Sequence, residues 1–338
     1  IKDWTLHRLT GVWATDFSLA SSTGLLDIHR LNWDEEALSL TGVSPERLPP
    51  LVSPFCVVGE LTEEAARETG LPAGLPVVAG GSDGGLANLG AGAVNPGQIV
   101  VTVGTSGAIR KVVDRPWFDR GERTWCYVFA EGRWFAGGAI NNGGLALQWV
   151  RERFYADLPE DAGYEQMLSD AGSVPPGAGG IFLLPYFSGE RSPHWDPDVR
   201  ALIYGLGLEH TRVHVARAAV EGVAFCLADV WQALAEEDKP VEPARLTGGI
   251  TRAPAWVQIL ADVLDIPLVP VEVADASALG AAILGQRALG NTQTLGVFQA
   301  PRVSNNAFAP DPERHAYYVH RHRAFQALYP LVQDFTSK

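Results

Sequence analysis

Three segments of the sequence repeat one local pattern, an apolar run that ends in a cluster of glycines beside a small polar residue. They are VVAGGSDGG at 77–85, IVVTVGTSG at 99–107 and RLTGGITR at 245–252. Such runs are typical of strands in an open α/β sheet, where ligands bind beyond the carboxyl ends of the strands. Glycines at these ends let the backbone approach a phosphate, and exposed amides bind anions. Three copies in one chain therefore favour a phosphate-bearing ligand.

The order of the expected elements predicts an α/β fold built on a mixed sheet. Residues 98–114 and 124–140 are each predicted to form two antiparallel strands, with turns at GTSG and at Glu131-Gly132. Strands and helices alternate afterwards, which favours helices packed on a sheet with parallel strands. The other strands are expected at 76–85, 181–187, 244–249 and 267–271, and the helices at 2–10, 16–24, 34–41, 60–71, 86–96, 144–154, 211–237, 253–264, 277–289 and 312–335.

Composition excludes several classes of partner. The 338 residues carry a formal net charge of −13, so nucleic acid and anionic membranes are not expected to bind, and HRHR at 320–323 is interpreted as a solvated helix face. The longest uncharged stretch, 84–109, holds seven glycines and is unsuited to a membrane-spanning helix. Three widely spaced cysteines without a CxxC motif argue against a disulfide framework or a structural zinc site, and they fit the cytoplasm.

Asp83 is the candidate catalytic residue, because its carboxylate follows a predicted strand and has glycines on both sides. A carboxylate in such a place can take the proton from a substrate hydroxyl during phosphoryl transfer. Two alternatives remain open from this residue alone. Asp83 could hold Mg²⁺, which prefers oxygen ligands, or it could simply cap a helix that begins near Gly84.

Two further loops are candidate nucleotide-binding segments. Gly104, Thr105 and Ser106 offer amides and hydroxyls to β- and γ-phosphates, although an ordinary hairpin turn would have the same sequence. Gly248 and Gly249 could lie against an adenine or an α-phosphate, or could form only a tight strand-to-helix turn. No GxxxxGK[ST] phosphate loop occurs, and no GxGxxG follows a predicted strand.

Four segments in this order resemble the FGGY family of carbohydrate kinases. They are GGSDGGLANLG, VTVGTSGAIR, LTGGITRAPAWVQILADVL and ASALGAAILG, and ALIYGLGLEHTRVHVARAAVE at 201–221 is similar to the family's second signature. The resemblance covers nearly the whole chain and implies the actin-like ATPase (ribonuclease H-like) fold. Within the family, GTSGAIR and PYFSGERSPHWDPDVRA are most similar to gluconate kinases, as is the Gly84-Gly85 pair that follows Asp83.

The resemblance also implies roles for individual residues. Asp83 matches the catalytic base, and Thr105 matches a position that contacts the transferring phosphate. Gly144 and Gln148 match nucleotide contacts, and Gly249 and Ala253 match adenosine-loop positions, although other branches have Asn at the place of Ala253. The implied cofactors are ATP and Mg²⁺, with no protein ligand of a metal assigned. Because lysines are scarce, an arginine is the expected partner of an anionic substrate.

One part of the family pattern is not found in the sequence. Family members carry an Asp-x-Gly-Thr phosphate loop in an amino-terminal strand–turn–strand, and the opening IKDW resembles the first signature already under way. Residues 1–92 therefore correspond to the end of the sugar-binding domain and residues 93–338 to a complete nucleotide-binding domain. A chain that begins at Ile1 is expected to retain the catalytic base and the residues that contact adenosine. Because it lacks half of the phosphate-binding residues, it is expected to have little or no kinase activity.

The sequence thus predicts an ATP-dependent kinase, with D-gluconate converted to 6-phospho-D-gluconate as the favoured reaction. Xylulose, ribulose or a polyol could replace gluconate as the substrate. An actin-like ATP-binding module without kinase activity is the alternative from another class. The apolar helices leave room for a homodimer interface.

Overall fold

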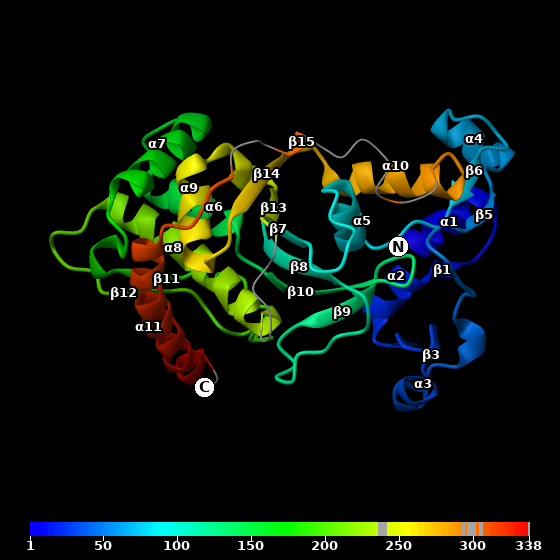
Figure 1. The fold of residues 1–338 in the computed structure, drawn as a ribbon, viewed down its shortest axis with the longest axis horizontal. Helices are drawn as coiled ribbons and strands as arrows, with labels where there is room; N and C mark the ends of the chain where they lie inside the picture. Colours follow the sequence, from blue (N-terminus) through cyan, green and yellow to red (C-terminus); the bar gives the residue numbers. More distant parts are fainter. Residues whose placement is uncertain (236–241, 293–294, 296–301, 304–306, 337–338) are drawn as a thin grey trace.

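The computed structural model describes residues 1–235, 242–292, 295, 302–303 and 307–336. Its centre is a mixed sheet of seven strands (Figure 1). In spatial order these are β15 (Arg302–Val303), β14 (Leu268–Glu272), β13 (Ala244–Thr247), β7 (Ile99–Val103), β8 (Gly107–Val113), β10 (Trp134–Ile140) and β9 (Trp125–Val128). β14, β13 and β7 run parallel, whereas the other neighbours pair antiparallel. The mixed sheet predicted from the order of elements is confirmed.

Helices cover both faces of this sheet. One face packs on α8 (Arg212–Leu234), which is buried along most of its length and is followed outward by α9 (Pro254–Leu264). The other face packs on α5 (Asp83–Gly90) and α10 (Ala276–Ala288). Alternation along the strands separates the two cores, since Ile109 contributes to the α8 side and Val112 to the α5 side.

The crossing of α5 and α10 depends on glycine. A Cβ atom added to Gly90 would lie 1.8 Å from the carbonyl oxygen of Ala276, and one added to Gly280 would lie 1.9 Å from that of Leu86. Any larger residue would force the two helices apart. The helix predicted over 86–96 is present as α5, but it begins at Asp83 and ends at Gly90.

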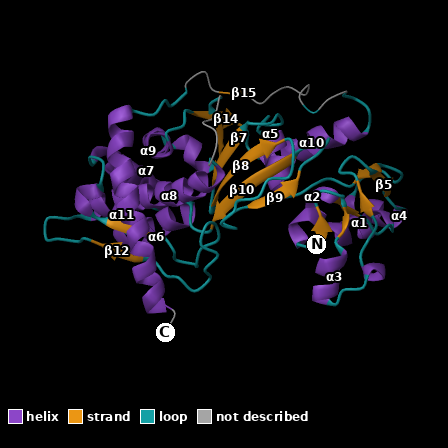
Figure 2. Cartoon of the chain, turned by 60° about the horizontal axis from the view of Figure 1, so that its bottom comes forward, coloured by secondary structure: helices purple, strands orange, loops and turns teal. Residues whose placement is uncertain are grey.

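Residues 1–78 form a separate group of short elements at one end of the molecule (Figures 1 and 2). The helices are α1 (Lys2–Thr10), α2 (Phe17–Ala20), α3 (Glu35–Thr41) and α4 (Glu63–Thr69), and the strand pairs are β1 (Thr15–Asp16) with β4 (Leu51–Val52), β2 (Leu26–Asp27) with β3 (Asn32–Trp33), and β5 (Val57–Glu60) with β6 (Pro76–Val78). The side chains of Asp16, Asp34 and Thr62 cap α2, α3 and α4. A strand does form at the start of the range 76–85, but the expectation of a buried strand of that length is wrong, because β6 ends at Val78, is half exposed and pairs only with β5.

The other end of the molecule is helical (Figure 2). It contains α6 (Gly144–Phe154), α7 (Glu160–Ser173), α8, α9 and α11 (Pro312–Thr336), together with the hairpin of β11 (Phe182–Leu184) and β12 (Leu202–Tyr204). The predicted helix at 211–237 is α8, with Thr211 as its cap, and residues 236–237 lie outside the described residues. The hairpin turn at Glu131-Gly132 is confirmed, with φ of 53° and 71°. None of the helices in the described part of the chain has the length and hydropathy needed to cross a bilayer.

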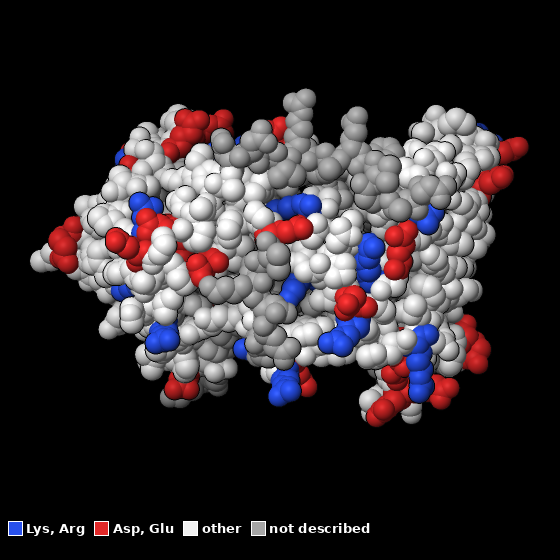
Figure 3. Space-filling model, viewed as in Figure 1, with Lys and Arg blue, Asp and Glu red and all other residues white. Residues whose placement is uncertain are grey.

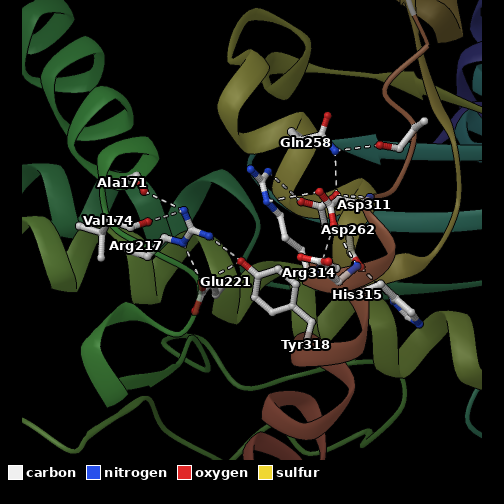
Figure 4. A network of polar contacts seen from close by, with 12 residues as sticks. Ala171, Val174, Arg217, Glu221, Gln258, Asp262, Asp311, Arg314, His315 and Tyr318 are labelled. Atoms are coloured by element: carbon white, nitrogen blue, oxygen red, sulfur yellow. Dashed lines mark hydrogen bonds and ion pairs between the residues drawn. The ribbon is translucent and has the colours of Figure 1, made fainter.

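A buried polar network attaches α11 to the rest of this end (Figure 4). On α8, Arg217 donates from Nε to Glu221 Oε1 (2.7 Å) and from Nη2 to the hydroxyl of Tyr318 on α11 (2.5 Å). A second buried pair joins His322 to Asp229 at 2.8 Å. The interpretation of 320–323 as a solvated face is therefore wrong for His322, because α8 supplies a buried carboxylate for its ring.

On the face of the molecule that is turned to the viewer in Figure 1, positive and negative side chains are mixed. Figure 3 shows Lys and Arg interspersed with Asp and Glu over that face, with acidic groups standing at both ends of the molecule.

Candidate active site

A cleft of about 680 Å³ opens at the ends of β7 and β13. Its walls come from the β7–β8 turn, the start of α6, α7 and the segment from Gly249 to Trp256. Six of the residues predicted to bind nucleotide line it, namely Gly104, Thr105, Gly144, Gln148, Gly249 and Ala253. The volume lies within the range that small-molecule sites occupy. Segments more than a hundred residues apart in the sequence thus meet around one cavity.

The β7–β8 turn is locked onto the start of α6. The carbonyl oxygen of Gly104 accepts a hydrogen bond from the amide of Gly144 (2.7 Å), and that of Thr105 accepts from Gly143 (3.1 Å) and Leu145 (3.0 Å). A Cβ on Gly144 would lie 2.7 Å from the Gly104 oxygen, so this contact requires glycine. The turn is consequently more than an ordinary hairpin connection, because it fixes the first turn of the helix that carries Gln148.

The Gly248-Gly249 pair makes a second close approach. Gly248 has φ of +93°, and a Cβ there would lie 2.3 Å from the carbonyl oxygen of Val103. This backbone brings the 3₁₀ turn Gly249–Arg252 to the end of β7, so that Gly249 faces the cleft. Gly248 and Ser106 do not line the cleft themselves. These two predicted nucleotide-binding residues belong to the loops that form the cleft walls but do not face the cleft.

Sequence reasoning missed the wall that α7 contributes. Asp161, Tyr164, Glu165 and Leu168 line the cleft from this helix, for which no element was predicted. Apolar Tyr164, Met167, Leu168 and Ala171 recur at helical spacing after Pro159, and this periodicity was a usable signal. Arg252 and Trp256 also line the cleft without having been predicted.

Asp83 lies outside this cleft, exposed at the first position of α5. Its Oδ1 accepts a hydrogen bond from the amide of Gly84 at 2.7 Å. Ser82 is the residue that caps the helix, since its Oγ accepts from the amide of Gly85 at 3.3 Å. The alternative in which Asp83 serves only as the helix cap is therefore wrong, and its carboxylate is left facing solvent.

Arg110 connects the surroundings of Asp83 to the strands that end at the cleft. Its half-buried guanidinium donates from Nη1 to Thr102 Oγ1 (3.2 Å), and Thr102 Oγ1 lies 2.9 Å from Thr247 Oγ1. Burial lowers the pKa of the Arg110 guanidinium to about 10, whereas the nearby charge of Asp83 raises it and that of Arg191 lowers it. Asp83 and Arg191 are thus its charged neighbours.

Two family models match the chain. The model of the carboxyl-terminal domain of FGGY carbohydrate kinases matches residues 99–289, and that of the amino-terminal domain matches residues 1–90. The chain belongs to the FGGY family of carbohydrate kinases. The kinship expected from the Gly-rich segments is therefore confirmed.

Individual FGGY proteins show how far the likeness extends. The chain is 39% identical over 320 residues to a gluconokinase of Bacillus licheniformis, covering 93% of this chain but 62% of that protein. Two solved structures from Lactobacillus acidophilus, each covered to 68%, superpose on 99% of this chain. They are a xylulose kinase (TM-score 0.92, 30% identity) and a gluconate kinase (TM-score 0.90, 31% identity). The predicted fold class, an actin-like ATPase fold with a mixed sheet and flanking helices, is confirmed.

The described residues contain no group of three or more His, Cys, Asp or Glu side chains arranged to hold a metal ion. Mg²⁺ is usually bound through substrate phosphates with one or two carboxylates, so it does not need such a group. The exposed carboxylate of Asp83 and the cleft-lining Asp161 and Glu165 are oxygen donors of the required kind.

Proposed function

We propose that the protein transfers the γ-phosphoryl group of ATP to a hydroxyl of a sugar or sugar acid, with Asp83 as the general base. The observation that carries this proposal is the exposed carboxylate of Asp83 at the start of α5. Its charge acts on Arg110, and Arg110 donates a hydrogen bond to Thr102 on the strand that ends in the Gly104–Thr105 turn. Phosphoryl transfer needs little covalent chemistry from the protein beyond positioning, charge stabilisation and a base.

The cleft is the proposed nucleotide site. Gly249 and Ala253 would hold the adenosine end. Gly104 and Thr105, together with Gly144 and Gln148 in the adjoining first turns of α6, would hold the phosphates. Ser106 and Gly248 would support these loops from behind. Mg²⁺ would accompany the phosphates and reduce their negative charge. The division of the chain at residues 92 and 93 belongs to this proposal, with the base on the last helix of the first part.

D-Gluconate is the proposed acceptor, with 6-phospho-D-gluconate as product. The support is the likeness to the Bacillus licheniformis gluconokinase, and the likeness to a xylulose kinase keeps xylulose, ribulose and polyols as alternatives. An enzyme that consumes ATP and has three free cysteines fits the cytoplasm. A homodimer stays a prediction.

The test is sugar-dependent release of ADP by the full natural chain that contains these residues. Gluconate, xylulose, ribulose and glycerol are offered in turn, and gluconate is expected to give the highest kcat/KM. Asp83→Asn should abolish the rate while the affinity for ADP stays unchanged. The matched control is Glu63→Gln, which also removes a charge at the first position of a helix but lies on α4.

Each other outcome changes a defined part of the proposal. Activity with only a neutral sugar would keep the reaction and overturn the substrate. A full rate in Asp83→Asn would overturn the assignment of the base. ADP binding without release on any sugar would favour the actin-like module that does not phosphorylate sugars.

A further inference from the structure

Arg110 has two charged neighbours, the carboxylate of Asp83 and a second arginine, Arg191. Arg110 comes from β8 and Arg191 from the loop that follows β11. A Cβ added to Gly84 would lie 3.1 Å from Nε of Arg110, so the arginine side chain runs directly beside the backbone that follows Asp83. Glycine at position 84 leaves the room for this approach.

Both guanidinium groups are held in place by neutral oxygens. Arg110 is fixed by Thr102 Oγ1, and Arg191 donates from Nη2 to the carbonyl oxygen of Ile140 (3.0 Å) at the end of β10. The backbone amide of Arg191 donates to Oε1 of the buried Glu190 at 2.8 Å. Because Thr102 and Ile140 lie near the ends of strands β7 and β10, both cations are fixed at the edge of the sheet where the Gly104–Ser106 turn lies.

Neither cation forms an ion pair with a residue that the structure describes. Among the described residues, no carboxylate oxygen lies within 4.0 Å of either guanidinium, although acidic residues outnumber basic ones in the chain. The two guanidinium groups repel each other, and that of Arg110 is half-buried. Both effects disfavour the charged form of Arg110. Two fixed, mutually repelling cations, one of which lies beside the proposed base, favour the binding of an anion between them.

We propose that Arg110 and Arg191 bind the phosphoryl group while it passes from the nucleotide to the hydroxyl at Asp83. This inference rests on the proposed function. The hydroxyl oxygen forms a bond to the γ-phosphorus as the bond from that phosphorus to the β–γ bridging oxygen breaks. ADP leaves with the electron pair, and the hydroxyl proton goes to Asp83. Negative charge spreads over the equatorial phosphoryl oxygens in this step, and planar guanidinium groups match such oxygens.

The position of Asp83 decides between the anions that the arginines could bind. The phosphoryl group must arrive where the base meets the reacting hydroxyl, and Arg110 lies beside that point. In gluconate the carboxylate is at the end of the molecule opposite the hydroxyl that is phosphorylated. The phosphoryl group is therefore the anion nearest to Arg110.

The kinetic test compares Arg110→Met and Arg191→Met with Arg110→Lys in the full natural chain. The methionine variants keep an apolar stem and are expected to lose about 10- to 100-fold in kcat, equally for gluconate and for a neutral sugar. The lysine variant should recover part of the loss, and the affinity for ADP should change by less than about twofold. Lys111→Met is the matched control, because it removes a positive charge from the next residue of β8, whose side chain alternates to the other face. A loss confined to KM for the sugar acid, or no loss at all, would overturn the inference.

A binding test separates this inference from the proposed function. Titration calorimetry with inorganic phosphate, in the presence of saturating ADP, should show binding to the wild-type chain that weakens about tenfold or more in each methionine variant. If the wild type lacks sugar-dependent ADP release but shows this pattern, the proposed function fails and the anion site stands. If the wild type is an active kinase and both its kcat and phosphate binding are indifferent to the two arginines, only this inference fails. Circular dichroism spectra that match the wild type establish that each variant is folded.

Discussion

Replacing Arg217 by methionine should destabilise the helical end of the molecule strongly. Its guanidinium donates to Glu221 within α8, to the carbonyl oxygens of Ala171 (3.1 Å) and Val174 (2.9 Å) at the end of α7, and to Tyr318 on α11 (Figure 4). Arg217 and Glu221 are 5% and 2% exposed, so bulk water replaces none of these contacts. One side chain therefore connects three helices.

The expected cost follows from what the substitution leaves behind. Glu221 would remain a buried carboxylate with only the amide of Gly177 (2.8 Å) and the hydroxyl of Tyr318 (2.9 Å) as donors. Removing one partner of a buried ion pair costs about 3–5 kcal/mol of unfolding free energy. Arg217→Met combined with Glu221→Gln removes the isolated charge and should recover about 1–3 kcal/mol of this cost.

The assay is equilibrium unfolding in urea, followed by tryptophan fluorescence. Arg212→Met is the matched control on the same helix, because the pair of Arg212 with Asp157 is exposed and such surface pairs contribute little to stability. A cost below about 1 kcal/mol for Arg217→Met, or a double variant less stable than the single one, would refute the reasoning.

Three further predictions concern the site and its supports. Gly248→Ala should weaken ATP binding measured by calorimetry, because its Cβ would lie 2.3 Å from the Val103 oxygen at a φ of +93°. Ser82→Ala should lower the unfolding free energy by about 1 kcal/mol in urea through loss of the α5 cap, whereas Asp83→Asn should leave it nearly unchanged. Burial raises the pKa of Glu190 from 4.5 to about 7 in the folded state, against the hydrogen bonds from two backbone amides, which lower it. The stability that it contributes is thus present below about pH 4.5 and lost as the pH rises through 7, so relative to Glu190→Gln the wild type should lose on the order of 3 kcal/mol over that window.

Each of these has a result that contradicts it. Gly249→Ala is the control for the neighbouring glycine, since its Cβ would meet only a side-chain atom of Arg252 at 3.8 Å, and equal effects at both positions would contradict the close-approach argument. Equal stability losses for Ser82→Ala and Asp83→Asn would return the capping role to the aspartate. Parallel pH–stability curves for the wild type and Glu190→Gln would show that Glu190 does not titrate in that window.

Local sequence signals predicted local structure well. The helices expected from residues 16, 34 and 211 begin directly after Asp16, Asp34 and Thr211, because a helix start depends on residues within one turn. The hairpin at Glu131-Gly132 formed for the same reason. The apolar run at 76–85 misled, because hydrophobicity indicates a strand but not which strand it joins, and β6 pairs outside the main sheet.

Side chains whose partners are distant in sequence could not be placed in this way. The run at 320–323 looked like a solvated face, but Asp229 on another helix makes His322 a buried partner. The wall of the cleft from α7 was missed, although Tyr164 and Leu168 follow helical spacing. A solvated helix face and a helix face over a cavity have similar composition, so periodicity alone does not separate them.

The sequence by itself determined that Gly-rich turns would follow β7 and β13 and that Asp83 would lie next to glycine, because glycine acts through backbone freedom that a linear pattern already contains. The tertiary structure decided which charges meet. Arg110 lies beside Asp83 because its side chain reaches from β8 to Gly84 at the start of α5, and Arg191 lies near Arg110 because its loop is anchored to the end of β10. Electrostatic interactions depend on distance in space, and only the folded chain sets that distance.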